Sequence, residues 1–389
     1  MAEYWPATLE CRNGIRSLSR FDPAGYPATL AGQIDGFRAG DHLSTRLLSQ
    51  TDISTQFGLV AAAEALVDAA LRPEDLAEYR AGVITSNATG GFAFTHEEFR
   101  KLWAQGPEFV SVYESFAWFY AVNTGQISIR HGLRGPGCVL VAEQAGGLDA
   151  IGQARRTIRA GTPLVVTGGV DSSLDPWGWL SLYSSGRVST AADPTRAYLP
   201  FDRSAAGHVP GEGGAILLLE EAEAARARDV PVYGSIAGYA ATFDPAPGSD
   251  RPPALQRAAE LAMDDAGLNP DDIDVVFADA AGVPDLDEIE ATALIRLFGP
   301  RGVPVTAPKA RTGRLYAGGG PLDVSTALLA LRDGVVPPTA EGIELPPHRP
   351  LDLVAGTPRQ VRLRTALVLA RGRHGFNSAV VVRAVGSGR

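Results

Sequence analysis

The most informative side chain in the sequence is Gln144, because a reactive group would be expected at its place. Residues 138–143 are apolar enough to form a buried strand. Small residues at 145–147 then lead from Gln144 into a helix predicted to continue to about Arg159. A sharp strand-to-helix elbow usually presents one nucleophile above helix N-terminal amides that stabilise an oxyanion. A carboxamide cannot be activated as a nucleophile at neutral pH, so this is either the frame of acyl transfer without its reactive group or an ordinary glycine-containing turn.

Composition excludes several classes of protein. The formal net charge of -9 argues against nucleic acid or an anionic membrane as the main partner. The two cysteines, Cys11 and Cys138, are too few for a disulfide framework or a cysteine-based zinc site, and we expect Cys138 to be buried and inert. The sequence has no run of 18 apolar residues and no signal peptide at its start, so we expect a cytoplasmic protein.

Strand-like apolar runs alternate with helical stretches from about residue 57 onward, which predicts an α/β fold with largely parallel sheets. The continuous apolar character of these runs suits burial on both faces of a sheet. The strands are expected at 81–86, 138–143, 164–169, 215–221, 274–280, 303–308, 366–371 and 378–383.

A weak internal repeat divides the chain into two similar α/β halves. Residues 138–161 and 303–334 share the order strand, small-residue turn and helix, and each half closes with a buried strand preceded by glycines. We therefore expect one domain at 1–225 and a second at 226–389.

Four landmarks in order carry a family resemblance: the elbow at Gln144, the glycine-rich segment 199–221, the Lys-x-x-Thr-Gly segment starting at Lys309, and Gly-Phe-Asn at 375–377. The set resembles the thiolase-fold β-ketoacyl synthases. Within them, 111–130 and AEQAGGLDAI are most similar to the chain-length factor, the ketosynthase β subunit of bacterial type II aromatic polyketide synthases. The resemblance implies a layered α-β-α-β-α architecture. It also implies that the first N-terminal strand of the fold is missing and that the natural start lies upstream of Met1.

The resemblance indicates a degenerate active site. Active condensing enzymes use a Cys and two His residues, whose positions fall at Gln144, Ala281 and Arg314, while Lys309 is retained. None of the six His residues of the chain stands at either place. A lone Lys supplies neither a nucleophile nor paired neutral donors for an enolate. We therefore expect no catalytic residue, cofactor or metal in this chain.

The segment around 92–103 has two interpretations. Phe92, Thr95 and Phe99 recur at spacings of three and four and share a helical face, which usually marks a core stripe. The resemblance implies instead that they and Trp177 line a tunnel whose bulk limits the growing polyketide, giving a product of about octaketide size.

Two further clusters have simpler interpretations. The aromatic residues between Tyr113 and Tyr120 are too dense for a solvated surface and suit a core or a subunit interface. The acidic residues between Asp285 and Glu290 are expected at a solvated helix N-terminus rather than at a metal site.

The resulting hypothesis is a non-catalytic subunit that pairs with a Cys/His/His ketosynthase α subunit and receives malonyl and polyketide chains on an acyl carrier protein. Whether the chain is itself an enzyme stays open. One alternative is a malonyl-carrier-protein decarboxylase that supplies an acetyl starter. Another is a hydrolase or transferase, for which the sequence offers no Ser-His-Asp order at a glycine elbow.

Overall fold

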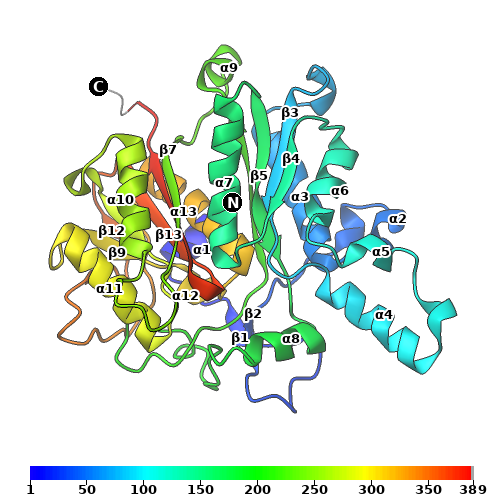
Figure 1. The fold of residues 1–389 in the computed structure, drawn as a ribbon, viewed down its shortest axis with the longest axis horizontal. Coiled ribbons are helices and arrows are strands. Elements are labelled where there is room, and N and C mark those ends of the chain that lie inside the picture. The colour runs from blue at the N-terminus through cyan, green and yellow to red at the C-terminus, as the bar shows by residue number, and fades with distance from the viewer. Residues whose placement is uncertain (387–389) are drawn as a thin grey trace.

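The computed structural model describes residues 1–386, and two sheets lie side by side at its centre (Figure 1). The first sheet has the strand order β4-β3-β5-β6, in which β3, β4 and β5 are parallel and β6 is antiparallel to β5. The bounds are β3 Ala81–Ser86, β4 Gly137–Leu140, β5 Leu164–Asp171 and β6 Gly213–Glu220. Every residue of β3 and β5 is buried, as continuous apolar runs predict.

The second sheet has the order β11-β9-β8-β13-β14-β7. Its bounds are β7 Ser235–Phe243, β8 Val275–Phe277, β9 Pro304–Thr306, β11 Asp352–Leu353, β13 Thr365–Arg371 and β14 Phe376–Arg383. The run β9-β8-β13-β14 repeats both the order and the strand directions of β4-β3-β5-β6. The two similar α/β halves are therefore present, with α9 (Ala222–Ala227) between them. Their treatment as domains at 1–225 and 226–389 stays a prediction.

Two helices pack on each other between the sheets, α7 (Gln144–Arg159) and α13 (Gly319–Asp333). Their apolar side chains and the inner faces of β8, β13 and β14 form one core cluster. The outer face of the first sheet is covered by α3 (Ile53–Asp68) and α6 (Val122–His131). The outer face of the second is covered by α10 (Leu255–Ala266) and α11 (Pro284–Phe298). The layers are thus α-β-α-β-α, as expected.

The remaining α-helices and strands lie around these layers, and all except α4 have eight residues or fewer. They are α1 Tyr4–Leu9, β1 Ile15–Ser17, β2 Leu30–Gly32, α2 Thr45–Leu48, α4 Phe92–Ala104, α5 Glu114–Ala117, α8 Pro176–Tyr183, α12 Lys309–Thr312, β10 Val335–Val336 and β12 Arg359–Gln360. Helix α4 projects from the body beside α8 (Figure 1). Within residues 1–386, no helix has the length and apolar character needed to cross a membrane.

The two sheets differ at both edges, and β11, which pairs with β9, has no counterpart beside β4 in the described residues. Strand β14 pairs with β7 on the side away from β13, whereas β6 pairs only with β5 in the described part of the chain. The counterpart of β7 is therefore absent beside β6 among residues 1–386.

Candidate functional site

The elbow expected at Gln144 is present. Strand β4 ends at Leu140, and α7 begins at Gln144. Between them, Glu143 adopts φ 51° and ψ -130°, a conformation that non-glycine residues rarely occupy. Its carboxylate accepts a hydrogen bond from the backbone N–H of Arg373 at 2.7 Å, which ties the turn to the second half. A sharp, strained turn thus raises Gln144 at the N-terminus of a long helix.

Small residues after the elbow are required by packing. A Cβ on Gly146 would lie 2.4 Å from the hydroxyl of Ser86, and one on Gly147 would lie 2.2 Å from the backbone oxygen of Ala317. Both distances are too short for any side chain beyond hydrogen. The elbow therefore fits closely against both halves of the fold.

Gln144 itself is fully enclosed. Neither its amide nitrogen nor its amide oxygen has a hydrogen-bond partner among the described residues. Its side chain lies against Gly319, where a Cβ would be 2.4 Å from the amide nitrogen. A buried polar group without partners costs stability, so hydrogen bonding within the described residues does not explain why a Gln occupies this position.

Arg314 is held by a buried ion pair with Asp279. The two side chains meet at 3.2 Å, and the guanidinium also donates to the backbone oxygen of Arg371 at 2.7 Å. Burial by itself lowers the pKa of Arg314, but the carboxylates of Asp279 and Glu143 together with Tyr198 outweigh it, so the pKa is raised and the guanidinium stays charged. Asp279 lies two residues before Ala281. The ion pair therefore brings Ala281 and Arg314, which stand at the two His positions of active condensing enzymes, close together. Arg314 is therefore a structural cation, and Ala281 has no polar side chain to offer.

Lys309 is also held by buried partners. Its ammonium donates to the backbone oxygen of Ala278 at 2.6 Å and lies 2.6 Å from a carboxylate oxygen of Asp323 on α13. Burial raises the pKa of Asp323 to about 6, and Lys309 opposes this rise. The retained Lys thus joins α12 to the central helix layer.

His208 is buried near the site, although its position in the sequence does not indicate a role there. The backbone N–H of Gly207 donates to the oxygen of Gly282 at 2.7 Å, which places His208 beside the Ala281 segment. Its ring lies 6.2 Å from that of Tyr316, and its Nδ1 has no partner among the described residues. Burial, then the charge of Arg314, holds the pKa of His208 well below its usual value, so the imidazole is neutral. Its place depends on a contact between distant segments, which spacing along the chain does not reveal.

Phe92, Phe99 and Trp177 form one aromatic cluster where α4 meets α8. The Trp177 ring lies 4.7 Å from that of Phe92 and 5.5 Å from that of Phe99. Both Phe side chains are half-buried, and Trp177 is 41% exposed. Thr95 lies on the same helix and is buried. The cluster is thus an open wall rather than a closed core, although its role in a tunnel stays a prediction.

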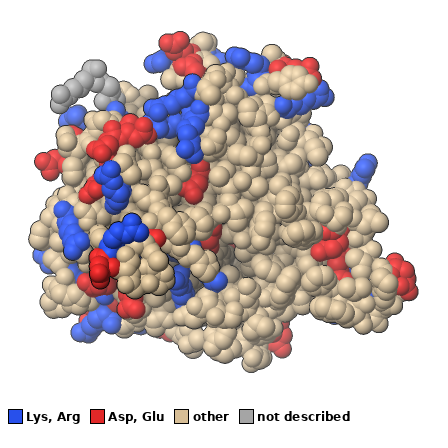
Figure 2. Space-filling model, viewed as in Figure 1, with Lys and Arg blue, Asp and Glu red and all other residues tan. Residues whose placement is uncertain are grey.

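An apolar face surrounds this wall. Figure 2 shows few charged side chains over β4, α5 and α6, in contrast to the side that carries α10 and α11. Trp118 and Phe119 from the aromatic segment are 47% and 46% exposed, which excludes the core interpretation for these two rings. Other large apolar side chains exposed in this region are Trp103, Phe109, Val112, Ile129 and Val141.

Two expectations about individual residues are wrong. Cys138 is exposed rather than buried, because β4 is an edge strand, although partial burial still raises the pKa of its thiol. Asp287 and Glu290 are buried rather than solvated, and each accepts two backbone hydrogen bonds. Among the described residues, no group of three side chains is arranged to hold a metal ion.

Comparisons with known proteins identify the family and agree with the fold. The chain matches the family models "Beta-ketoacyl synthase, N-terminal domain" over residues 1–225 and "Beta-ketoacyl synthase, C-terminal domain" over residues 233–342. It is 66% identical over 384 residues to the actinorhodin polyketide putative β-ketoacyl synthase 2 of Streptomyces coelicolor, covering 98% of this chain and 94% of that protein. It is 58% identical over 383 residues to the tetracenomycin polyketide synthase ketoacyl synthase β subunit of Streptomyces glaucescens, with the same coverage. Among solved structures, it matches the ishigamide ketosynthase/chain length factor with a TM-score of 0.90 and 26% identity, over 99% of this chain and 95% of that one.

Proposed function

Because the chain belongs to the β-ketoacyl synthase family, among the β subunits of polyketide synthases, we propose that it is the non-catalytic, chain-length-determining half of a heterodimer. The other half is a ketosynthase α subunit with Cys and two His residues, and the pair condenses malonyl units carried on an acyl carrier protein. The observation that carries the proposal is Gln144, an unreactive carboxamide on an intact elbow. A cytoplasmic location stays a prediction.

The groups around the elbow support the proposal that this chain does not catalyse condensation. Decarboxylative condensation develops an enolate that needs preorganised neutral donors or a cation free to approach it. Ala281 has no donor, and both Arg314 and Lys309 are engaged by buried carboxylates. Neither the nucleophile nor a free donor at the positions of the two His residues of active condensing enzymes is available among these groups.

One observation favours the decarboxylase alternative. The neutral imidazole of His208 lies beside the Ala281 segment and has a ring nitrogen without a partner in the described part of the chain. A neutral imidazole carries one N–H, and the backbone of Ala281 already interacts with this ring, so His208 donates to a developing enolate oxygen only in the tautomer with its proton on Nδ1. Gln144 could supply a second donor, since its amide nitrogen is also unpaired among the described residues. We rank this function below the scaffold role because malonyl-carrier protein would still need an entry path to a fully enclosed Gln144.

Subunit pairing is supported by the apolar face. Trp103, Val112 and Ile129 are each more than three-quarters exposed, which is unfavourable for large apolar side chains on a free surface. Edge strand β4 lies in the same face and has no strand partner on its outer side among residues 1–386. A face that combines apolar side chains with an open strand edge suits an obligate interface.

Control of product length is supported by the aromatic cluster. Phe92, Phe99 and Trp177 contact one another yet stay partly exposed, so they form a wall that a partner subunit can close into a tunnel. Aromatic rings remove volume that a growing chain would otherwise fill. Their truncation should therefore lengthen the product.

Reconstitution with the partner tests the length function. Phe99→Ala should release longer polyketides than the wild-type heterodimer in mass spectrometry, and the double change with Phe92→Ala should extend them further. Phe94→Ala is the matched control, because Phe94 lies on the same helix but is offset from the shared face of Phe92 and Phe99. An unchanged length distribution at normal activity for both Phe99 variants would return these residues to ordinary packing.

The purified chain alone tests the catalytic question. With malonyl-carrier protein we expect no condensation, and condensation should appear only when the partner is added. Release of carbon dioxide by the chain alone, abolished by His208→Phe, would support the decarboxylase alternative instead. Light scattering provides the pairing test, and a stable monomer at micromolar concentration would contradict an obligate interface.

A further inference from the structure

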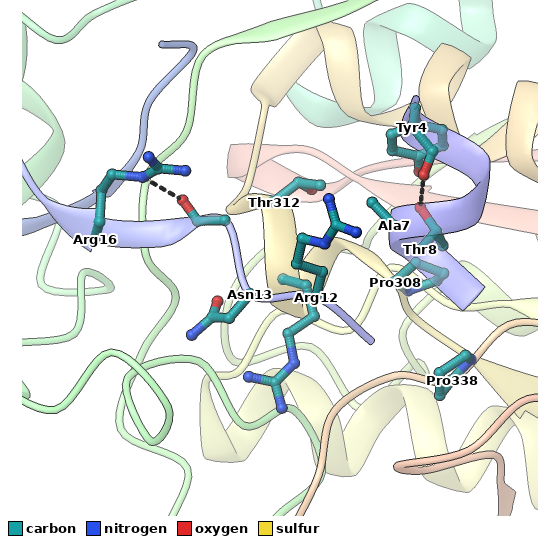
Figure 3. A pocket seen from close by; sticks show the side chains of 11 residues that line it. Tyr4, Ala7, Thr8, Arg12, Asn13, Arg16, Pro308, Thr312 and Pro338 are labelled. Atoms are coloured by element: carbon teal, nitrogen blue, oxygen red, sulfur yellow. Dashed lines mark hydrogen bonds between the residues drawn. The ribbon is translucent and has the colours of Figure 1, made fainter. Parts of the chain in front are cut away.

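A cavity of about 170 Å³ lies outside the site described above, between α1, the turn that follows it, and α12. Figure 3 shows Arg12, Asn13 and Arg16 from the N-terminal segment on one side and Thr312 with Pro308 on another. Its polar lining side chains are those of Tyr4, Thr8, Arg12, Asn13, Arg16, Arg311 and Thr312. Three of them are cations, and none of the described residues that line it is acidic.

Arg311 is the unusual member of this lining. The residue is 8% exposed, and no hydrogen bond or ion pair joins its guanidinium to any described group. Its Nε is fully enclosed and lacks an acceptor. A cation removed from water without a counter-charge is strongly unfavourable.

The other buried arginines of residues 1–386 differ from Arg311 because each has a nearby carboxylate. Arg155, Arg314, Arg349 and Arg371 each lie within 4 Å of a carboxylate. Arg311 alone among these five has no anionic partner within residues 1–386. Its missing partner is therefore best sought in the cavity that its side chain lines.

The remaining lining groups leave the positive charge of Arg311 uncancelled. Arg12 pairs with Glu10 at 2.5 Å, and Arg16 pairs with Asp35, but neither carboxylate lines the cavity. The side chains of Arg12 and Arg16 are both more than half exposed, so they mark the mouth of the cavity. An anion entering there meets cations from two sides.

We propose that this cavity binds a small oxyanion of phosphate type, with the guanidinium of Arg311 at its base and Arg12 and Arg16 at its mouth. A guanidinium presents a planar fork that matches phosphate oxygens in pairs. A closed cavity of about 150 Å³ accommodates a benzene molecule, so this one has room for a phosphate group. The group is either free phosphate or the terminal phosphate of an ester whose remainder leaves through the mouth.

Occupancy of the cavity bears on the neighbouring site. Arg311 lies in α12 between Lys309 and Arg314, and its backbone oxygen accepts from the N–H of Gly14 at 2.8 Å. Gly32 packs so closely that a Cβ there would lie 1.8 Å from the backbone oxygen of Thr312. A bound anion would hold the N-terminal segment and α12 together.

The test uses the full chain purified in phosphate-free buffer. Inorganic phosphate should raise the Tm saturably beyond the effect of sodium chloride at equal ionic strength, as expected for a ligand that binds only the folded state. Arg311→Met should weaken phosphate binding at least tenfold in calorimetry. Without phosphate, this variant should unfold at the same or a higher temperature, because an uncompensated buried charge is gone. Arg257→Met, an exposed change on α10, is the matched control and should behave as the wild type.

Two outcomes would overturn the proposal. One is a wild-type Tm that follows ionic strength alone, and the other is an Arg311→Met variant that binds phosphate as the wild type does. If Arg311→Met does not fold, the double variant Arg12→Gln/Arg16→Gln should still weaken phosphate binding severalfold, and unchanged binding would count equally against the site. Glycerol 3-phosphate distinguishes a phosphate ester from free phosphate as the natural ligand. If it binds more tightly than inorganic phosphate, the ligand is an ester, and if it binds more weakly, the ligand is the free ion.

Discussion

Removing the charge of Arg314 should destabilise the protein more than any surface substitution. In Arg314→Met, the carboxylate of Asp279 stays 1% exposed but loses the guanidinium that pairs with it at 3.2 Å. Breaking a buried ion pair from one side typically costs about 3–5 kcal/mol. We expect a loss of about 3 kcal/mol at pH 8, because the backbone N–H of Arg371 still donates to Asp279 at 2.9 Å.

The stability cost of Arg314→Met should depend on pH in a defined direction. Burial raises the pKa of Asp279, but Arg314 and then Lys309 outweigh it, so the pKa lies below its usual value. A depressed carboxyl pKa contributes stability above the unfolded-state pKa of about 3.9, and that contribution is lost as the pH falls through the folded-state pKa. In Arg314→Met, burial dominates and the pKa is raised instead. The variant then loses stability as the pH rises above about 4, so its deficit relative to the wild type is larger at pH 8 than at pH 5.

The measurement is urea unfolding at both pH values and at one fixed protein concentration. Arg203→Met is the matched control, because its ion pair with Glu344 is exposed and should contribute less than about 1 kcal/mol. The double variant Asp279→Asn/Arg314→Met should recover most of the loss. The reasoning is refuted if Arg314→Met costs no more than the control, or if its cost is the same at pH 5 and pH 8.

Three further outcomes are expected. Gln144→Met should match or exceed the wild type in stability, by up to about 1–3 kcal/mol, since it removes unpaired buried polar atoms, whereas Gln144→Cys should show no condensing activity in a carrier-protein assay. Burial and then the charge of Asp279 raise the pKa of Glu290 to about 7, so wild-type stability should fall as the pH rises from about 4.3 to 7. Glu290→Gln should reduce that fall in urea titrations but not abolish it, because burial also raises the pKa values of Asp171 and Asp287 to about 7. Phe99→Ala should cost less than the roughly 3–5 kcal/mol typical of a fully buried Phe, because Phe99 is half-buried, and a larger loss of unfolding free energy would contradict an open wall.

The fold and the elbow could be predicted because each depends on local pattern. Continuous apolar runs specify buried strands, and the small residues after Gln144 specify a tight strand-to-helix turn. The ordered landmarks then fixed the family. Strand ends were less accurate, since β4 ends at Leu140 rather than at Glu143, where the backbone turns through a positive φ. Nothing in the side-chain pattern of 138–143 marks that turn.

The partners within the site could not be predicted because they come from distant segments. Asp279 and Arg314 are 35 residues apart, and Glu143 meets Arg373 across 230 residues. The burial of Glu290 depends on backbone N–H groups that a strand end aims at its helix, which periodicity alone does not show. His208 was missed for the same reason, since its neighbour is a segment more than seventy residues away.

The buried pair of Arg314 and Asp279 also restricts the order in which this chain could regain the chemistry that its family performs. A neutral His in place of Arg314 would remove the cation paired with Asp279 and leave only Lys309, Arg371 and a backbone N–H to stabilise the carboxylate, so the first step would lower stability while restoring no activity. Replacing Asp279 first instead leaves the buried guanidinium of Arg314 without its paired carboxylate. A return to the active-site residues that begins at either member of this pair therefore passes through a less stable protein before Gln144 and Ala281 are changed. If the chain is non-catalytic as proposed, this ion pair makes a return to catalysis by single substitutions unfavourable.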